Sequence, residues 1–286
     1  MKNILITGKN SYIGTSVEKW LLREPDKYKV DTVDMQNESW KNKDFSKYDV
    51  VFHVAGIAHV SFDPKMKDLY YKVNRNLTIK TAQKCKSEGV RQFIFMSSII
   101  VYGDSSREKG IIYRDTVPLP NNFYGKSKLE AEEGISNLEN ENFKIVVLRP
   151  PMTYGKGSKG NYPKLATVAK RLRVFPDFNN ERSMIHIDNL CEFVKLMIDN
   201  EEQGLYFPQN KEYVKTSELV KTIANLHGKN VIMTKIFNPA IKLFVGINLV
   251  NKVFGNLVYD KSMSNYDKSD YRIRTFLESI ELTENN

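Results

Sequence analysis

The stretch that decides the fold of this chain is Ile4-Leu5-Ile6-Thr7-Gly8-Lys9-Asn10-Ser11-Tyr12-Ile13-Gly14. Its first four residues predict a buried strand, and the residues from Tyr12 onward predict a helix. Gly8 permits a tight turn off the strand, and Gly14 allows the helix to pack closely on a sheet. The free N–H groups at the start of such a helix bind phosphate groups. The stretch therefore predicts a phosphate-binding turn, although a plain strand–turn–helix has the same pattern and Ser11 holds the position of a usual middle glycine.

The next predicted strand bears on the choice of dinucleotide. Asp34 follows that strand, twenty positions after Gly14. A carboxylate there accepts hydrogen bonds from the adenosine ribose hydroxyls and repels a 2′-phosphate, which favours NAD(H). Lys9 in the turn favours a 2′-phosphate, so NADP(H) stays open as an alternative. An Asp at a strand end is also a common turn residue.

Short β-branched runs continue to alternate with helical patterns, which indicates an α/β fold with a Rossmann-type, doubly wound parallel sheet. We predict strands over 30–33, 50–54, 93–96 and 144–148, and helices over 12–22, 69–86 and 123–138. A basic helix from Pro163 to Arg173, a strand–helix unit over 184–198 and an amphipathic helical tail from about Lys211 follow. These patterns predict a dinucleotide-binding domain of residues 1–155 plus about 183–207, and a smaller interleaved substrate lobe of about 156–182 and 208–286.

Composition restricts the class of protein. The chain has 286 residues, of which 41% are hydrophobic and 27% charged, as in ordinary globular proteins. Its two cysteines, Cys85 and Cys191, form no disulfide framework and no metal-ligand pattern, which predicts a cytoplasmic protein without a metal site. The net charge of +9 comes from scattered lysines without a nucleic-acid-binding motif, so we expect an anionic small-molecule substrate and no nucleic acid. The apolar stretch 236–258 is interrupted by polar residues, which predicts no membrane insertion but leaves attraction to a membrane surface open.

A second motif, Tyr124-Gly125-Lys126-Ser127-Lys128, carries chemistry. Residues four apart share a helix face, so the Tyr124 hydroxyl and the Lys128 ammonium can converge. A free tyrosine has a pKa near 10, and a neighbouring ammonium lowers that pKa by stabilising the phenolate. Ser98 follows the strand 93–96 at its carboxyl end, where parallel sheets bind ligands. We therefore expect Ser98, Tyr124 and Lys128 to form a catalytic group.

Over nearly its whole length the chain resembles the NAD-dependent epimerase/dehydratase family of extended short-chain dehydrogenases. The resemblance rests on the runs 6–14, 53–56, 73–74 with Thr78, 97–103, Tyr124 with Lys128, 148–150 and 182–188. It implies that Ser98 binds the reacting sugar oxygen, that Tyr124 transfers a proton, and that Lys128 holds the nicotinamide ribose. The implied cofactor-binding residues are Gly8, Ser11, Tyr12, Ile13, Gly14, Asp34, Asp44, Phe45, Val54, Ala55, Gly56, Asn74, Tyr124 and Lys128, and the implied substrate-binding residues are Ser98, Tyr124, Asn161 and Arg182. The chain departs from the family pattern at Ser11, which replaces the middle glycine, and at Ser183, which replaces a usual Asp. The family's common second substrate arginine is missing from its usual setting, although Arg272 and Arg274 are nearby.

The resemblance also narrows the reaction. Dehydratases of this family carry an acid–base pair beside the catalytic serine or threonine, where this chain has Ile99 and Ile100. The segments 150–165 and 254–260 are similar to those of bacterial surface-polysaccharide enzymes, including UDP-N-acetylquinovosamine-type synthases. We therefore expect reduction of the C4 ketone of a UDP-4-keto-6-deoxy-N-acetylhexosamine, with a UDP-glucose or UDP-GlcNAc 4-epimerase as the alternative. A homodimer is a family expectation, and the intact catalytic group argues against a binding protein without turnover.

Overall fold

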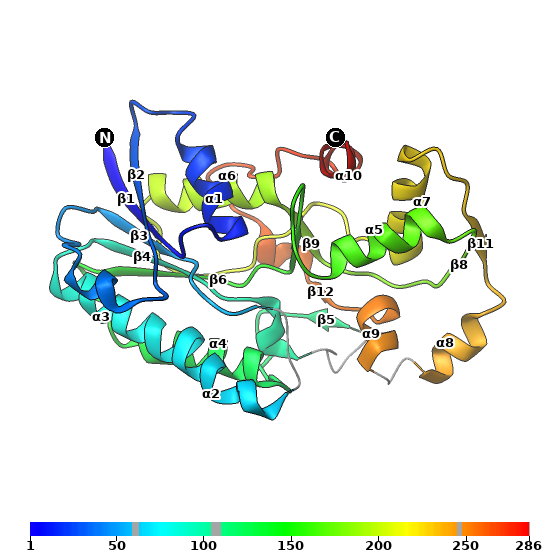
Figure 1. The fold of residues 1–286 in the computed structure, drawn as a ribbon, viewed down its shortest axis with the longest axis horizontal. Coiled ribbons are helices and arrows are strands. Elements are labelled where there is room, and N and C mark those ends of the chain that lie inside the picture. The colour runs from blue at the N-terminus through cyan, green and yellow to red at the C-terminus, as the bar shows by residue number, and fades with distance from the viewer. Residues whose placement is uncertain (59–62, 104–109, 245–247, 286) are drawn as a thin grey trace.

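A computed structural model describes residues 1–58, 63–103, 110–244 and 248–285. Its centre is a parallel sheet of six strands in the order β10-β6-β4-β3-β1-β2 (Figure 1). The strands are β1 (Lys2–Thr7), β2 (Tyr28–Val33), β3 (Val50–His53), β4 (Gln92–Met96), β6 (Lys144–Leu148) and β10 (Gly204–Tyr206). The strand order reverses at β1, because β2 and β3 lie on its opposite sides. The doubly wound parallel fold is confirmed, and its switch point lies between the carboxyl ends of β1 and β3.

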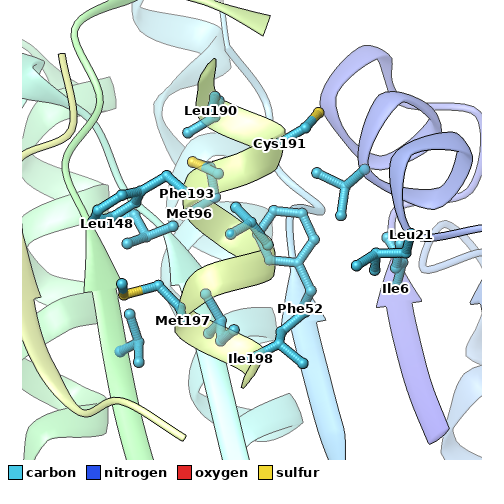
Figure 2. Packing of buried hydrophobic residues seen from close by; sticks show 14 of the residues in the cluster. Ile6, Leu21, Phe52, Met96, Leu148, Leu190, Cys191, Phe193, Met197 and Ile198 are labelled. Atoms are coloured by element: carbon cyan, nitrogen blue, oxygen red, sulfur yellow. The ribbon is translucent and has the colours of Figure 1, made fainter. Parts of the chain in front are cut away.

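Both faces of this sheet are covered by helices, which explains the continuous apolar strands (Figure 1). The helices α1 (Tyr12–Leu21) and α6 (Ile187–Asp199) cover one face, and α3 (Leu77–Ser87) and α4 (Phe123–Ser136) cover the other. Alternate strand residues point to opposite faces, so Ile6, Phe52, Met96 and Leu148 pack with α6 in a single cluster. Figure 2 shows the α6 side chains inserted against these strand residues.

The helix predicted over 69–86 is present with a change of geometry in its middle. The chain forms α2 (Lys67–Tyr70), then a π-helical segment η3 (Tyr71–Asn76), and then α3. A π-helical turn holds one residue more than an α-helical turn, and such turns occur frequently at functional sites. The apolar pattern of the sequence is too coarse to reveal a single added residue. Asn74 lies buried within this π-helical segment.

A separate apolar cluster lies in the carboxyl-terminal half, with residues from α5 (Asn161–Arg171), α7 (Thr216–Leu226), α9 (Asn248–Phe254) and α10 (Phe276–Glu284). The helix α8 (Asn238–Phe244) contributes no residue to this cluster. Three strand pairs are β7 (Met152–Tyr154) with β9 (Met184–His186), β8 (Val174–Pro176) with β11 (Ile232–Thr234), and β5 (Ile111–Ile112) with β12 (Val258–Tyr259). Short 3-10 turns are η1 (Glu38–Asn42), η2 (Pro64–Met66), η4 (Ile99–Tyr102) and η5 (Lys261–Ser264). The tail expected to be helical thus also contains β11 and β12, because each finds a partner strand far away in the sequence.

No helix in the described parts of the chain has the length and apolarity needed to cross a membrane. The connection from β9 through α6 to β10 returns the chain from the lobe to the sheet, where β10 pairs with β6.

Candidate active site

The turn at the end of β1, which the sequence predicts to bind phosphate, requires its glycines for steric reasons. Gly8 has a φ of 86°, and a Cβ there would lie 3.0 Å from the backbone of Ala55. A Cβ on Gly14 would lie 2.6 Å from Ser11 Oγ and 3.1 Å from Val54 Cγ1. Ser11 itself caps α1, since its hydroxyl accepts a hydrogen bond from the Gly14 N–H at 3.2 Å. The residue that replaces the middle glycine therefore stabilises the start of the helix.

A buried chain of hydrogen bonds fixes the segment after β3. The Ala55 N–H donates to Thr7 Oγ1 at 3.4 Å, Thr7 Oγ1 lies 2.9 Å from His53 Nδ1, and His53 Nε2 lies 3.1 Å from Thr78 Oγ1. The Thr78 hydroxyl donates to the Asn74 carbonyl at 2.7 Å, so it must accept from a protonated Nε2. Nδ1 then accepts from Thr7, which assigns the neutral Nε2–H tautomer. Burial lowers the pKa of His53 to about 3, in agreement with this neutral form.

Asn74 holds the same segment from the other side. Its Oδ1 accepts from the Ile57 N–H at 2.8 Å, and its Nδ2 donates to the Ile57 carbonyl at 3.1 Å and to Ser127 Oγ at 3.2 Å. A Cβ on Gly56 would lie 3.1 Å from Asn74 Oδ1 and 3.2 Å from Lys128 Nζ. Asn74 was expected to bind the cofactor, and the structure shows it positioning the backbone beside Gly56. Its direct contact with a cofactor stays a proposal.

The catalytic group expected from the sequence is assembled from two elements. Ser98 is the N-cap of η4 just beyond β4, and its Oγ accepts from the Ile100 N–H at 3.3 Å. Tyr124 lies in the first turn of α4, whose start is capped by Asn122. Ser98 hydrogen-bonds the Tyr124 side chain, and Lys128 follows one turn later on α4. The structure therefore brings Ser98 and Tyr124 into contact.

The electrostatics of this group differ from the expectation. Burial raises the pKa of Tyr124 to about 12, opposed by the Ser98 hydrogen bond, and burial lowers the pKa of Lys128 to about 8. Lys128 is only 4% exposed, and its Nζ donates to the Met96 carbonyl at 2.8 Å. The predicted lowering of the Tyr124 pKa by Lys128 is thus absent from this structure, because the ammonium is directed toward the end of β4. Tyr124 is held as a neutral phenol that can donate a proton.

A buried ion pair beneath the catalytic group was missed by the sequence analysis. Glu132 and Arg149 are both buried, and their side chains pair with N–O distances from 2.5 to 3.2 Å. Ser97 donates to Glu132, and the Arg149 guanidinium donates to the Tyr102 hydroxyl at 2.6 Å. Glu132 lies one helical turn beyond Lys128 and opposes the lowering of its pKa. That i, i+4 spacing was the available signal, but it does not name Arg149 as the partner.

The remaining residues expected to bind the cofactor differ in exposure and in hydrogen-bond partners. Asp34 lies directly after β2, is half-buried, and accepts from the Gln36 N–H at 2.8 Å. Phe45 is fully buried in the core and its N–H donates to Glu88 at 2.6 Å, so its side chain is structural, whereas Asp44 is exposed. In the described part of the chain the buried Tyr12 hydroxyl has no hydrogen-bond partner, and burial raises the pKa of Tyr12. Ile13, half-buried in the first turn of α1, packs against the core beside it.

The expected substrate residues come from separate elements of the lobe. Asn161 is the exposed first residue of α5. Arg182 is half-buried, and its Nη1 donates to the carbonyls of Asn251 at 3.3 Å and Gly255 at 3.1 Å. Ser183, at the usual Asp position, bonds Gln209 and accepts from the Tyr259 N–H. The roles of Asn161 and Arg182 toward a diphosphate stay proposals.

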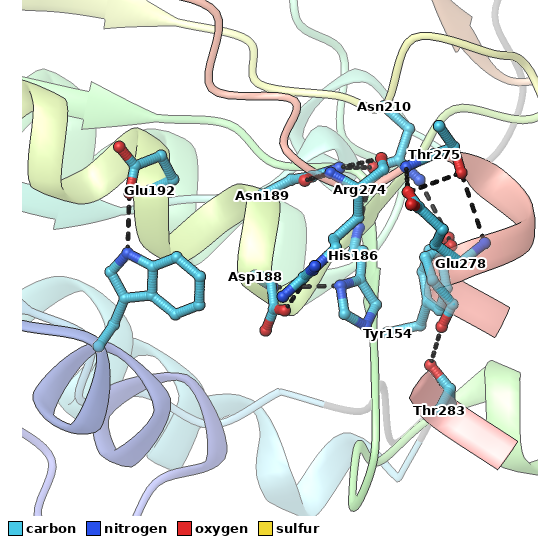
Figure 3. Close-up of polar contacts among 12 residues, drawn as sticks. Tyr154, His186, Asp188, Asn189, Glu192, Asn210, Arg274, Thr275, Glu278 and Thr283 are labelled. Carbon is cyan, nitrogen blue, oxygen red and sulfur yellow. Dashed lines mark hydrogen bonds and ion pairs between the residues drawn. The ribbon is translucent and has the colours of Figure 1, made fainter. Parts of the chain in front are cut away.

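The two later arginines are already engaged in the fold. Arg274 pairs with Asp188 at 2.9 Å, and Arg272 donates to the Ser264 carbonyl at 2.7 Å. Figure 3 shows Arg274 and Asp188 beside His186 and the Asn189–Asn210 bond at the start of α6. His186 is the buried last residue of β9 and caps α6. These contacts fix the carboxyl-terminal segment to the start of α6.

Comparisons with known proteins identify the family. A profile of the NAD dependent epimerase/dehydratase family matches residues 4–207. The chain belongs to this family. It is 27% identical to a UDP-glucose 4-epimerase of Vibrio cholerae, over 91% of this chain and 88% of the relative. It is 25% identical to a GDP-6-deoxy-D-mannose reductase of Pseudomonas aeruginosa, over 79% of this chain and 80% of the relative.

The solved structure of UDP-glucuronic acid 4-epimerase from Bacillus cereus, in complex with NAD, has the same fold. Its TM-score is 0.76 at 20% identity, with 98% of this chain and 94% of that chain covered. In the present chain, Gly8, Gly14 and Gly56 lie at the switch point of the sheet, where an added Cβ atom would meet neighbouring atoms closely. This close packing fits the binding of a dinucleotide at the switch point.

Proposed function

We propose that the chain reduces the C4 ketone of a UDP-4-keto-6-deoxy-N-acetylhexosamine with NADH, for surface-polysaccharide synthesis. The observation that carries this proposal is the Ser98–Tyr124 contact at the carboxyl end of β4, with Lys128 on the same helix face. The neighbouring Ile99 and Ile100 offer no second acid–base pair for dehydration. Nucleotide-sugar epimerases and reductases among the relatives support C4 chemistry of this kind.

The roles of the side chains follow from their protonation states. Bound NADH supplies the hydride that reaches C4. Ser98 donates a hydrogen bond to the C4 oxygen, on which negative charge develops. Tyr124, neutral at physiological pH with a pKa of about 12, gives its phenolic proton to that oxygen. Lys128 binds the nicotinamide ribose and, when its ammonium faces the ribose, stabilises the phenolate that remains.

The proposal also assigns residues to the adenosine end of the dinucleotide and to the diphosphate of the nucleotide sugar. Asp34 would accept the adenosine ribose hydroxyls after β2, and Asp44 would lie beside the adenine. Asn161 and Arg182 would bind the diphosphate of the nucleotide sugar, since a guanidinium matches phosphate oxygens in a bidentate manner. Arg182 would then exchange its carbonyl contacts near α9 for phosphate oxygens.

A second candidate is a UDP-hexose 4-epimerase. It is favoured by the 27% identity to the Vibrio cholerae epimerase over nine-tenths of the chain. In that reaction the ionised form of Tyr124 would accept the proton of the C4 hydroxyl while the C4 hydride passes to bound NAD+. After the hydride returns to the opposite face of the sugar ring, Tyr124 would give the proton back to the C4 oxygen. The same three residues would be needed.

One assay distinguishes the two candidates. Purified full-length protein is mixed with UDP-4-keto-6-deoxy-N-acetylglucosamine and NADH or NADPH, and separately with UDP-glucose or UDP-GlcNAc without added cofactor. A reductase consumes reduced cofactor and forms a new deoxysugar. An epimerase interconverts the UDP-sugars unaided. If neither substrate class is converted, the proposed function is wrong.

A further inference from the structure

We infer that the end of the substrate lobe formed by β8, β11 and α8 docks on an anionic lipid bilayer. This surface, called the lobe tip below, lies at the end of the molecule away from the six-stranded sheet (Figure 1). Its apolar residues are Val174, Ile232, Ile236, Phe237, Leu243 and Phe244, all of them exposed. The inference does not depend on which C4 reaction the site performs.

The lobe tip presents its apolar side chains in a fixed arrangement. Val174 and Ile232 are register partners in the β8–β11 pair, so their side chains point to the same face. The chain then turns into α8, which buries Ile241 and leaves Leu243 78% exposed. Asn238 at the start of α8 donates to the Asp177 carbonyl at 3.0 Å, which ties α8 to the end of β8. A folded scaffold therefore holds these apolar side chains outward.

The charge of the same surface is strongly positive. Residues 219–259 contain five lysines and no acidic residue. The exposed cations at the lobe tip are Arg171, Arg173, Lys229, Lys235 and Lys242, and none of them forms an ion pair within the described residues. Asp177, at the end of β8, is bound by Lys215 at 2.6 Å and by Ser217, and it also interacts electrostatically with Lys235 without forming an ion pair with it. Uncompensated cations around exposed apolar side chains are typical of helices that lie in the interface of anionic membranes.

The charge also argues against other occupants. A second copy of this chain meeting tip to tip would bring five cations against five without counter-charges. A nucleic acid would neutralise the cations but would leave Ile236, 83% exposed, and Leu243 without apolar contacts. An anionic bilayer satisfies both features, since lipid headgroups pair with the cations and the acyl boundary accepts the apolar side chains.

The test is co-sedimentation of the full-length protein with vesicles of phosphatidylcholine, with and without phosphatidylglycerol. We expect binding to the anionic vesicles only, weakening as salt is raised. We expect vesicle binding to be weakened at least about tenfold in each of two double variants. The first is Leu243→Ser, Phe244→Ser, and the second is Lys235→Glu, Lys242→Glu. The matched control, Val117→Ser with Lys29→Glu, changes an exposed apolar and an exposed basic residue elsewhere and should bind as the wild type does.

Turnover of the nucleotide sugar and the melting temperature are measured on every variant, so that loss of folding is distinguished from loss of docking. Lobe-tip variants that fold and turn over normally but still bind anionic vesicles like the wild type would overturn the inference. So would equal binding to neutral vesicles, or binding to duplex DNA without binding to vesicles. A wild-type dimer that the Leu243→Ser, Phe244→Ser variant converts to a monomer, with no vesicle binding, would assign the surface to a second copy.

Discussion

The candidate active site, at the carboxyl end of the sheet, and the lobe tip differ in which kind of side chain is buried and which is exposed. At the candidate active site, polar side chains such as His53, Asn74 and Glu132 are buried, and each is hydrogen-bonded to a neighbour. At the lobe tip, apolar side chains such as Leu243 are exposed among cations without acidic partners. Buried polar groups need hydrogen-bond partners within the protein, whereas exposed apolar side chains can be buried only against another molecule. The first region is thus organised before its ligand arrives, and the second is completed by what it binds.

The largest effect is expected from the proton donor at the organised end. Tyr124→Phe keeps the ring and its packing but removes the transferable proton, so kcat should fall by about a hundred- to ten-thousand-fold. Dinucleotide affinity, measured by fluorescence titration, should stay nearly unchanged. Tyr113→Phe, an exposed tyrosine, is the control and should retain wild-type turnover. A Tyr124→Phe protein within about threefold of wild type would remove the catalytic assignment.

Breaking the buried ion pair should lower stability next most strongly. Glu132→Gln leaves the Arg149 guanidinium buried without a counter-charge, which should cost about 3–5 kcal/mol in the free energy of unfolding. Urea denaturation measures this cost. Glu133→Gln, at the exposed neighbouring position, should change stability by less than about 0.5 kcal/mol.

The double variant Glu132→Leu, Arg149→Met sharpens that test, because it removes both charges together. It should recover much of the stability that Glu132→Gln loses. A double variant as unstable as the single one would show that the hydrogen bonds to Ser97 and Tyr102, not the charges, stabilise this region.

The buried amine should make stability depend on pH in the alkaline range. The pKa of Lys128 is lowered by burial from 10.5 to about 8, so between these values the unfolded chain binds the additional proton. Lys128 should therefore contribute a rise in the free energy of unfolding from pH 8 toward pH 10.5, by up to about 2–3 kcal/mol. This rise is measured as the difference between the wild-type and Lys128→Met profiles, because buried cysteines and tyrosines whose pKa is raised act in the opposite direction. Lys128→Met should lose this rise, whereas Lys242→Met at the lobe tip should keep it. Identical pH profiles for the wild type and Lys128→Met would contradict the burial of a titrating amine.

The smallest effect is expected at Arg182, whose side chain contacts the carbonyls of Asn251 and Gly255. Arg182→Ala removes the proposed bidentate ligand of the diphosphate and should raise KM for the nucleotide sugar about tenfold, with kcat nearly unchanged. Steady-state kinetics provide both constants. The control is Arg171→Ala at the lobe tip, which should leave KM as it is. An unchanged KM for Arg182→Ala would place the diphosphate elsewhere and leave Arg182 a structural role through its contacts to Asn251 and Gly255.

Much of the fold and the centre of the site could be predicted from the sequence because they rest on local rules. The spacing of apolar residues predicted every strand of the main sheet except β10, and the strand 184–186 with its following helix. Gly8 predicted a tight turn after the first strand, and its positive φ in the structure agrees with that turn. The i, i+4 spacing put Tyr124 and Lys128 on one face of α4, and their family resemblance was confirmed.

Tertiary structure alone decided how these parts meet. The sequence does not show that Glu132 on α4 pairs with Arg149 beyond β6, or that His53 bridges β1 to α3. The sequence predicted that the Lys128 ammonium faces Tyr124, whereas in the structure it donates to the Met96 carbonyl. The sequence also did not distinguish Phe45, which is buried in the core, from its exposed neighbour Asp44. In the stretch 236–258 the sequence showed an apolar and basic composition, and the structure showed which side chains of its described part, such as Ile236 and Leu243, are exposed. The reason is physical: a repeat or a glycine reports on the backbone within a few residues, whereas a side chain's partner and its pKa depend on elements that become neighbours only once the sheet order is set.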